Sequence, residues 1–171
     1  MGPLLIFAMF VVSLALQGSV LALVGTSGVH PDILLVLVVV LGLLSDTKHG
    51  ALAGLAAGLL QDVMFGSPLG FFAFINMLTG ALAGMLADEV NKDFMPAPVM
   101  LVAFFTVFSG LLAFMLTRFY SIPQPHSFVE YMQQVSLPRV AMHVIFTGLV
   151  YPCLYRMQKR RLLFSDTESA D

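Results

Sequence analysis

Residues 50–70 of the chain read GALAGLAAGLLQDVMFGSPLG. The glycines Gly50, Gly54 and Gly58 recur every four residues in this stretch, so they share one row along a predicted helix. A row without side chains lets a second helix approach closely, which favours helix association in membranes. The stretch ends in Asp62 and in a glycine- and proline-containing pentapeptide, residues 66–70, which predicts a tight turn into another helix.

A second glycine row, Gly80 and Gly84, lies on that next predicted helix, and the pentapeptide Gly-Ala-Leu-Ala-Gly occurs at both 50–54 and 80–84. The two rows have two interpretations, which are packing of these helices on each other and contact with a partner's helix. We favour packing within the chain for the first row. If one row meets a partner, we expect it to be the row of Gly80 and Gly84.

The composition identifies the solvent. Hydrophobic residues make up 58% of the chain, charged residues make up 11%, and the mean hydropathy is +0.92. A soluble domain of this length could not bury so many apolar side chains, so lipid surrounds most of the protein. The formal net charge of -2 excludes a basic face for nucleic acid. The single cysteine, Cys153, excludes an intramolecular disulfide and clusters built on paired cysteines.

The apolar background predicts an all-α integral membrane protein, a compact bundle of about six transmembrane helices. The predicted segments are 3–24, 33–44, 51–65, 69–87, 97–116 and 140–155. The second and third are short for a span of about 20 residues, and a re-entrant hairpin over 33–65 is the alternative. We expect one transmembrane domain over 1–161 and a short disordered polar tail over 162–171. The first segment lacks the basic start of a signal peptide, so we expect it to be retained.

Basic residues predict the orientation. Arg156, Lys159, Arg160 and Arg161 follow the last apolar segment, which places the C-terminus in the cytoplasm by the positive-inside rule. Six spans then place the N-terminus in the cytoplasm as well, whereas five spans with a re-entrant hairpin would place it outside.

The longest loop, 118–139, carries a helix start. Ser127 and Glu130 have the spacing of a capping box. Phe128 and the apolar positions after it predict a short amphipathic helix that Pro138 ends. This helix either rests on the lipid surface, which we favour, or forms a docking ledge for an outer partner.

Few polar residues interrupt the spans, and each requires an explanation. Asp32 follows Pro31 at the start of the second segment, where a carboxylate meets the positive end of a helix dipole. We expect Asp62 to accept backbone N–H groups at the start of the fourth segment rather than to relay protons. Asn76 is predicted to bond to a neighbouring helix, and His143 to be packed and neutral. We find no catalytic, cofactor-binding or metal-ligating set, so we expect no enzyme activity and no cofactor.

The motif residues resemble a known family. Pro31-Asp32 opens an apolar run, and the glycine row from Gly50 leads through Asp62 to Gly66-x-Pro68-Leu-Gly70. This pattern resembles the bacterial rod shape-determining protein MreD. The resemblance implies a non-enzymatic subunit of the cell-elongation machinery in the cytoplasmic (inner) membrane, associated with MreC and acting with MreB, RodA and a class B penicillin-binding protein in peptidoglycan synthesis and cell shape.

The resemblance also implies a fold and a rival function. The family's fold is thought to be similar to the S-components of vitamin transporters, so small-molecule uptake is the alternative function. Such a subunit needs a pocket near the outer face lined by aromatic and polar side chains. We expect few such groups there, and the chain has no tryptophan. A secondary transporter would need inverted repeats and charges at the midplane, and we find neither.

Overall fold

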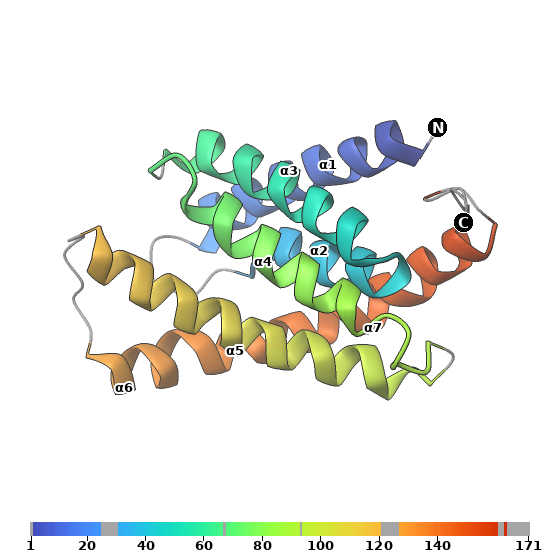
Figure 1. Cartoon of the computed structure of the whole chain (residues 1–171). Helices are drawn as coiled ribbons and strands as arrows, with labels where there is room; N and C mark the ends of the chain where they lie inside the picture. The colour runs from blue at the N-terminus through green and yellow to red at the C-terminus, as the bar shows by residue number, and fades with distance from the viewer. Residues whose placement is uncertain are drawn as a thin grey trace.

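The structure, a computed structural model, describes residues 2–24, 31–66, 68–92, 94–120, 127–160 and 163. These residues form the predicted all-helical bundle (Figure 1). Its elements are α1 (Gly2–Val24), α2 (Ile33–Leu44), α3 (Thr47–Phe65), α4 (Phe71–Met85), α5 (Pro96–Phe119), α6 (Phe128–Tyr131), the π-helix η1 (Met132–Ser136) and α7 (Leu137–Lys159). The tail at 162–171, predicted to be disordered, lies outside the described residues apart from Leu163.

The long helices alternate in direction. Helix α1 begins and α7 ends at the same end of the bundle, which lies on the right in Figure 1. Within the described residues, three helical stretches are long and apolar enough to cross a membrane: Gly2–Ser19, Pro96–Phe119 and Phe128–Lys159. Helices α2 and α4 are apolar but shorter. The number of bilayer crossings, six or five, therefore stays a prediction.

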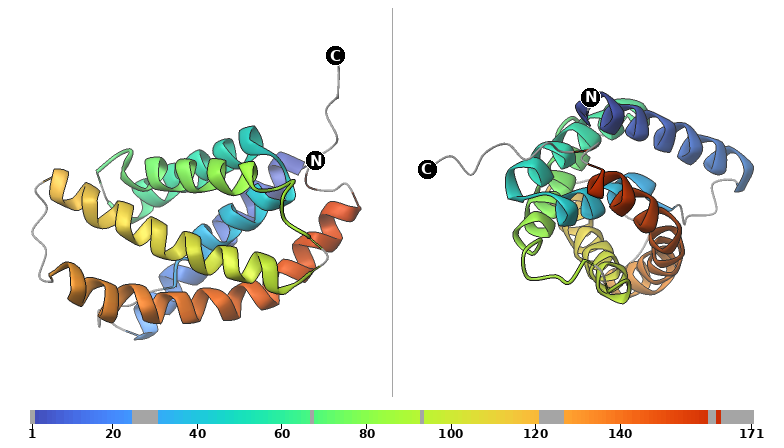
Figure 2. Two further views of the ribbon diagram at one scale, coloured as in Figure 1. Left: turned by 60° about the horizontal axis from the view of Figure 1, so that its bottom comes forward. Right: turned by 90° about the vertical axis from the view of Figure 1, so that its right-hand side faces the viewer.

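Helix α2 is the centre of the bundle. All 12 of its residues are buried, and it packs against α1, α3, α4, α5 and α7. The end-on view in Figure 2 shows these helices arranged around it. Its sequence, ILLVLVVVLGLL, has no polar face, as expected for a helix covered on every side. Because the other helices separate α2 from lipid, its apolar run can be shorter than that of a lipid-facing span.

Helices α3 and α4 approach each other through their glycine rows. A Cβ added to Gly50 would overlap the backbone oxygen of Gly80, and one added to Gly54 would overlap the backbone oxygen of Asn76. Only glycine permits this backbone contact. The predicted packing of these two helices on each other is what the structure shows.

The second row does not face a partner in this structure. Gly80 and Gly84 are both buried. A Cβ on Gly80 would overlap the backbone oxygen of Gly50, and one on Gly84 would overlap that of Asp46. Our expectation that these glycines are the better partner surface is corrected by this contact, because their bare face is already covered by α3 and by the residues that begin it.

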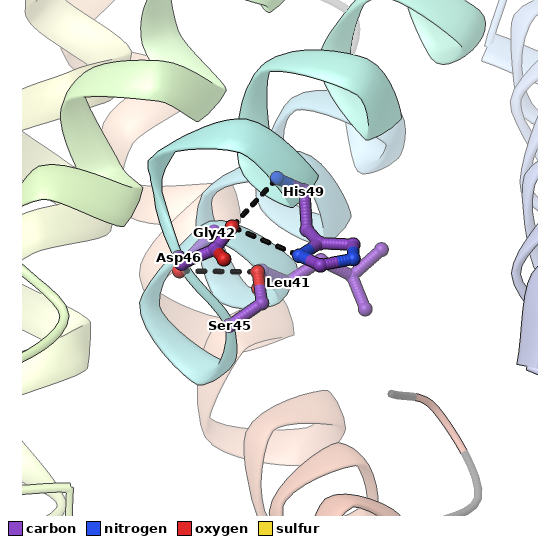
Figure 3. Close-up of polar contacts among 5 residues, drawn as sticks. All are labelled: Leu41, Gly42, Ser45, Asp46 and His49. Atoms are coloured by element: carbon purple, nitrogen blue, oxygen red, sulfur yellow. Dashed lines mark hydrogen bonds and ion pairs between the residues drawn. The ribbon is translucent and has the colours of Figure 1, made fainter. Parts of the chain in front are cut away.

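The connection between α2 and α3 is short and capped on both sides (Figure 3). The Ser45 hydroxyl donates to the Leu41 carbonyl at 2.7 Å. The Asp46 carboxylate accepts the His49 N–H at 2.7 Å and lies 2.9 Å from the His49 Nδ1. Partial burial acts to raise the pKa of Asp46, but the hydrogen bonds and charge of His49 outweigh it and hold that pKa below its ordinary value. Helix α3 consequently begins at Thr47, four residues earlier than predicted.

The predicted capping box is confirmed, but the helix that it starts continues into the last span. Ser127 accepts the Glu130 N–H, and the Glu130 carboxylate accepts the Ser127 N–H. Helix α6 then passes through η1 into α7, so Pro138 does not end it. Pro138 lies in the first turn of α7, directly after the π-helix, where a helix tolerates a residue without an N–H.

The glycine contact predicts that the loss of stability caused by a bulky side chain depends on which glycine it replaces. Gly54→Leu should lower the stability of the bundle on the order of 3 kcal/mol, because a side chain there displaces the α4 backbone. Gly148→Leu is the matched control, since an added Cβ at Gly148 on α7 meets nothing within 4 Å. Yield of monodisperse protein and thermal unfolding in detergent measure both. Equal stability of the two variants would show that α3 and α4 do not meet at their glycines.

Candidate functional site

Asp62 joins α3 to the start of α4. Its side chain is buried, with 1% exposed. The carboxylate accepts the backbone N–H groups of Gly70 at 2.9 Å, Phe72 at 2.8 Å and Ala73 at 3.2 Å. These are among the N–H groups that a helix start leaves without an intrahelical partner, and the helix dipole favours a negative charge beside them. The structural role predicted for Asp62 is present in this geometry.

The turn between these helices needs its two glycines. Gly66 ends α3 with φ 66°, and Gly70 precedes α4 with φ 95°. Both values lie in the left-handed region that glycine adopts without strain. The Pro68 carbonyl accepts the Phe71 N–H at 3.0 Å. The turn predicted at 66–70 therefore brings the first N–H groups of α4 onto Asp62; Ser67 lies outside the described residues.

Asp32 is the acceptor at which three helices meet. Its carboxylate caps α2 by accepting the Leu35 N–H at 3.1 Å, as its position after Pro31 predicts. The Gln17 side chain on α1 donates to the Pro31 carbonyl at 3.0 Å and to Asp32 at 3.3 Å. The Gln61 side chain on α3 donates to the other Asp32 oxygen at 3.2 Å. The carboxylate thus links α1, α2 and α3.

The chain of polar contacts continues into α4. The Asn76 amide nitrogen donates to the Gln61 side-chain oxygen at 3.0 Å. Both residues are buried, and the Gln61 amide nitrogen itself donates to the Asp32 carboxylate. The expectation that Asn76 bonds to a neighbouring helix is confirmed. Its partner, Gln61 on α3, in turn bonds to the Asp32 carboxylate.

His143 brings α5 and α7 to the same point. The backbone N–H of Asp32 donates to His143 Nε2 at 2.7 Å. His143 Nδ1 lies 2.8 Å from the Thr106 hydroxyl, which donates to the Val102 carbonyl at 2.7 Å. Because Nε2 accepts, Nδ1 carries the proton and donates to Thr106, so this geometry fits a neutral imidazole. His143 is fully buried. Helices α1, α3, α4, α5 and α7, together with the N-cap residue of α2, therefore contribute to one largely buried network.

The members of this network bond mainly to one another, although the side-chain oxygens of Gln17 and Asn76 have no partner among the described residues. Its amides, hydroxyl and imidazole are hydrogen-bond partners across helices, and neither carboxylate faces a serine, threonine or cysteine poised as a nucleophile in the contacts above. In the described part of the chain, no group of three or more His, Cys, Asp or Glu side chains could hold a metal ion. The arrangement is suited to fixing helix positions in lipid, where unpaired polar groups are costly.

A cavity of about 300 Å³ opens beside the network. It lies at the end of the bundle where α3 passes into α4, on the left in Figure 1. Its walls combine network residues with aromatic side chains and one arginine: Gln17, Asp32, Gln61, Phe65, Phe71, Phe72, Tyr131 and Arg139. In the predicted orientation this end faces outward, where we expect few aromatic and polar groups, and the cavity corrects that expectation. They are scattered in sequence, and only the fold collects them.

Sequence reasoning missed four residues of this site: Gln17, Gln61, Thr106 and Arg139. Gln17 and Gln61 carried a usable signal, since an amide within an apolar helix needs a partner. Thr106 carried none, because a threonine can bond to its own helix backbone. Arg139 was read only as a loop charge outside the last span, whereas it lies in the first turn of α7 and lines the cavity.

The capping geometry predicts a graded response at Asp62. Asp62→Asn keeps one oxygen that can accept N–H groups, so we expect a loss of about 1 kcal/mol. Asp62→Leu leaves the buried N–H groups of Gly70, Phe72 and Ala73 without this acceptor, so we expect a loss of about 3 kcal/mol or more and little assembled protein. Unfolding in detergent measures both. Equal failure of the two variants would mean that the charge, rather than the acceptor, is required.

The comparisons with known proteins agree with the motif. The family described as rod shape-determining protein MreD matches residues 1–161, which include every helix of the bundle. Among curated proteins and among solved structures, no significant match is found. The similarity to S-component folds therefore stays a prediction. With its apolar helices and a family match over nearly its whole length, the chain belongs to the MreD family of rod shape-determining membrane proteins.

Proposed function

We propose that this protein is a non-enzymatic multi-pass scaffold of the cell-elongation machinery, which binds an MreC-like membrane protein and helps to organise peptidoglycan synthesis and cell shape. The observation that carries the proposal is the family match over residues 1–161. The buried network supports it, because its polar side chains bond helix to helix instead of surrounding a reacting group. MreB, RodA and a class B penicillin-binding protein are the further partners that we propose for the same assembly.

A groove between α1 and α7 is our candidate site for the partner's transmembrane helix. It encloses about 350 Å³, and its floor is formed by Ile33 and Leu37 of α2. One wall is a stripe of α1 that runs from Leu5 to Leu16, and the other contains Phe146 and Val150 of α7. The stripe covers about 16 Å of helix length at 1.5 Å per residue. This is about half of a bilayer core, which suffices for a crossing contact with a second helix.

The chemistry of the groove suits a helix in lipid. Its lining contains no charged residue, and small side chains at Ala8 and Ser13 lower the wall where a backbone can approach. Among the described residues, helix α1 packs against α2 and α3. The glycine rows, in contrast, are already used inside the chain. The groove therefore replaces Gly80 and Gly84 as the partner surface in our proposal.

We propose the cytoplasmic (inner) membrane as the location, with six spans and both termini in the cytoplasm. The alternating helices and the basic residues at the end of α7 support this orientation. Cysteine labelling from outside, in a Cys153→Ser background, should reach position 133 in η1 but not position 89 between α4 and α5. The reverse pattern would overturn the orientation.

The cavity is the one observation that favours the alternative, a vitamin-uptake subunit. The two functions differ in what co-purifies from native membranes in mild detergent. Cell-wall synthesis proteins would support the scaffold, and an energising ATPase module would support uptake.

The groove predicts where a partner cross-links. A photo-reactive residue at Val12 on α1, which is 58% exposed, should cross-link to a co-expressed MreC-like protein. The same residue at Phe104 on α5, which is 60% exposed, is the matched control and should not. In addition, Ala8→Phe should fill the groove, so that the protein accumulates normally, loses co-purification and leaves rod-shaped cells rounded.

Two results would contradict this placement. Cross-linking at Phe104 but not at Val12 would move the partner to the opposite side of the bundle. Ala8→Phe with an intact complex and normal cell shape would remove the groove from the interface while leaving the scaffold function open to another surface.

A further inference from the structure

Two buried polar atoms beside the cavity have no partner among the described residues. They are the side-chain oxygen of Gln17 and the Nε of Arg139, and both residues line the cavity. Gln17 is 4% exposed, and its amide nitrogen already donates to the Pro31 carbonyl and to Asp32. Its oxygen is therefore an acceptor fixed in place without a donor. Buried polar atoms are nearly always paired, so this acceptor points to a missing ligand.

Arg139, in contrast, has a buried donor nitrogen without an acceptor in the described part of the chain. Its guanidinium stays charged at all physiological pH values. Asp32 is the carboxylate that shares the cavity, but it already accepts from Leu35, Gln17 and Gln61, and it forms no ion pair with Arg139. A cation within a membrane bundle is expected to pair with an anion or with acceptor oxygens. The lining of the cavity thus includes a cation, an unpaired acceptor and a carboxylate that is already engaged.

The remaining wall is aromatic. Phe72 and Tyr131 line the cavity, and Phe65 lines it while 43% of its surface is exposed. Phe65 therefore connects the cavity to the apolar outer surface of α3, where Val63 and Met64 are also exposed. The volume of about 300 Å³ suits a head group or small solute rather than a whole lipid. A ligand with a polar head inside and apolar chains outside meets both conditions.

We propose that the cavity binds a phosphate ester that carries a neighbouring N–H or O–H donor, as in the head group of phosphatidylethanolamine or phosphatidylglycerol. The phosphate oxygens would accept from Arg139, for which guanidinium is a strong charge-assisted donor. The amine or hydroxyl would donate to the Gln17 oxygen, and an amine would also lie near Asp32. The acyl chains would leave over Phe65. Phosphatidylcholine has the same phosphate but no donor, so it binds weakly.

The test compares lipids by native mass spectrometry of the full chain in detergent. Bound lipid is counted during titration with phosphatidylethanolamine, phosphatidylglycerol or phosphatidylcholine of matched acyl chains. We expect the first two to bind about tenfold or more tightly than the third, because phosphatidylcholine would leave the buried Gln17 oxygen without a donor. We expect Arg139→Gln, which removes the partner of the phosphate, to weaken binding of all three lipids about tenfold. Arg118→Gln, which removes an exposed cation of α5 outside the cavity, should change nothing.

Three results would overturn the proposal or part of it. Equal binding of the three lipids by the unaltered protein would overturn the proposal, and this comparison stands even if Arg139→Gln fails to fold. Equal loss in Arg118→Gln and Arg139→Gln would also overturn it, since general surface attraction would explain both. A separate titration uses phosphoethanolamine, which has the head group but no chains. Binding as tight as that of the lipid would retain the phosphate chemistry and overturn the lipid as its source.

Discussion

Lipid offers no hydrogen bonds, and this constraint determines how the polar side chains inside the bundle are arranged. Every carboxylate, amide or imidazole inside the bundle must find its partner in the protein. Asp62 meets the requirement with three backbone N–H groups at the start of α4. Asp32 meets it with one backbone N–H and two side-chain amides from neighbouring helices. The two carboxylates therefore set the positions of helix ends that apolar packing alone would leave free to slide.

Glycine contacts and polar contacts stabilise the bundle at different places. The α3–α4 pair is joined along its length by Gly50, Gly54 and Gly80, whose backbones nearly touch. The same pair is pinned at one end by Asp62, which prevents one helix from shifting along the other. Helix α2 then fills the centre with aliphatic side chains. Beside these tightly packed helices, α1 and α7 border the groove that we propose as the partner's site.

The sequence predicted most of what depends on local patterns. The all-helical class, the capping box at Ser127, the turn at Gly66 and Gly70 and the role of Asp62 all follow from residues close together in the chain. The cavity did not, because Gln17, Gln61 and Arg139 lie on three different helices and meet only after folding. The expectation that Gly80 and Gly84 face a partner fails for a related reason. A glycine row shows that a helix can come close, but it does not show whether that helix belongs to the same chain, as it does for Gly80.

The central claim is that a chain of buried side chains holds the helices in register, and a double-mutant cycle between Gln61 and Asn76 tests it most directly. The free energy of unfolding in mixed micelles is measured for the unaltered protein, Gln61→Met, Asn76→Leu and the double variant. Gln61→Met, at a buried position of α3, and Leu52→Ala, at an exposed position of the same helix, form a distant control pair. We predict a coupling energy of about 0.6 kcal/mol or more for Gln61 with Asn76, in the range of interhelical hydrogen bonds in membranes. The control pair should be additive. Additivity of Gln61 with Asn76 would contradict the account, because the side chains would then be buried side by side without holding α3 to α4.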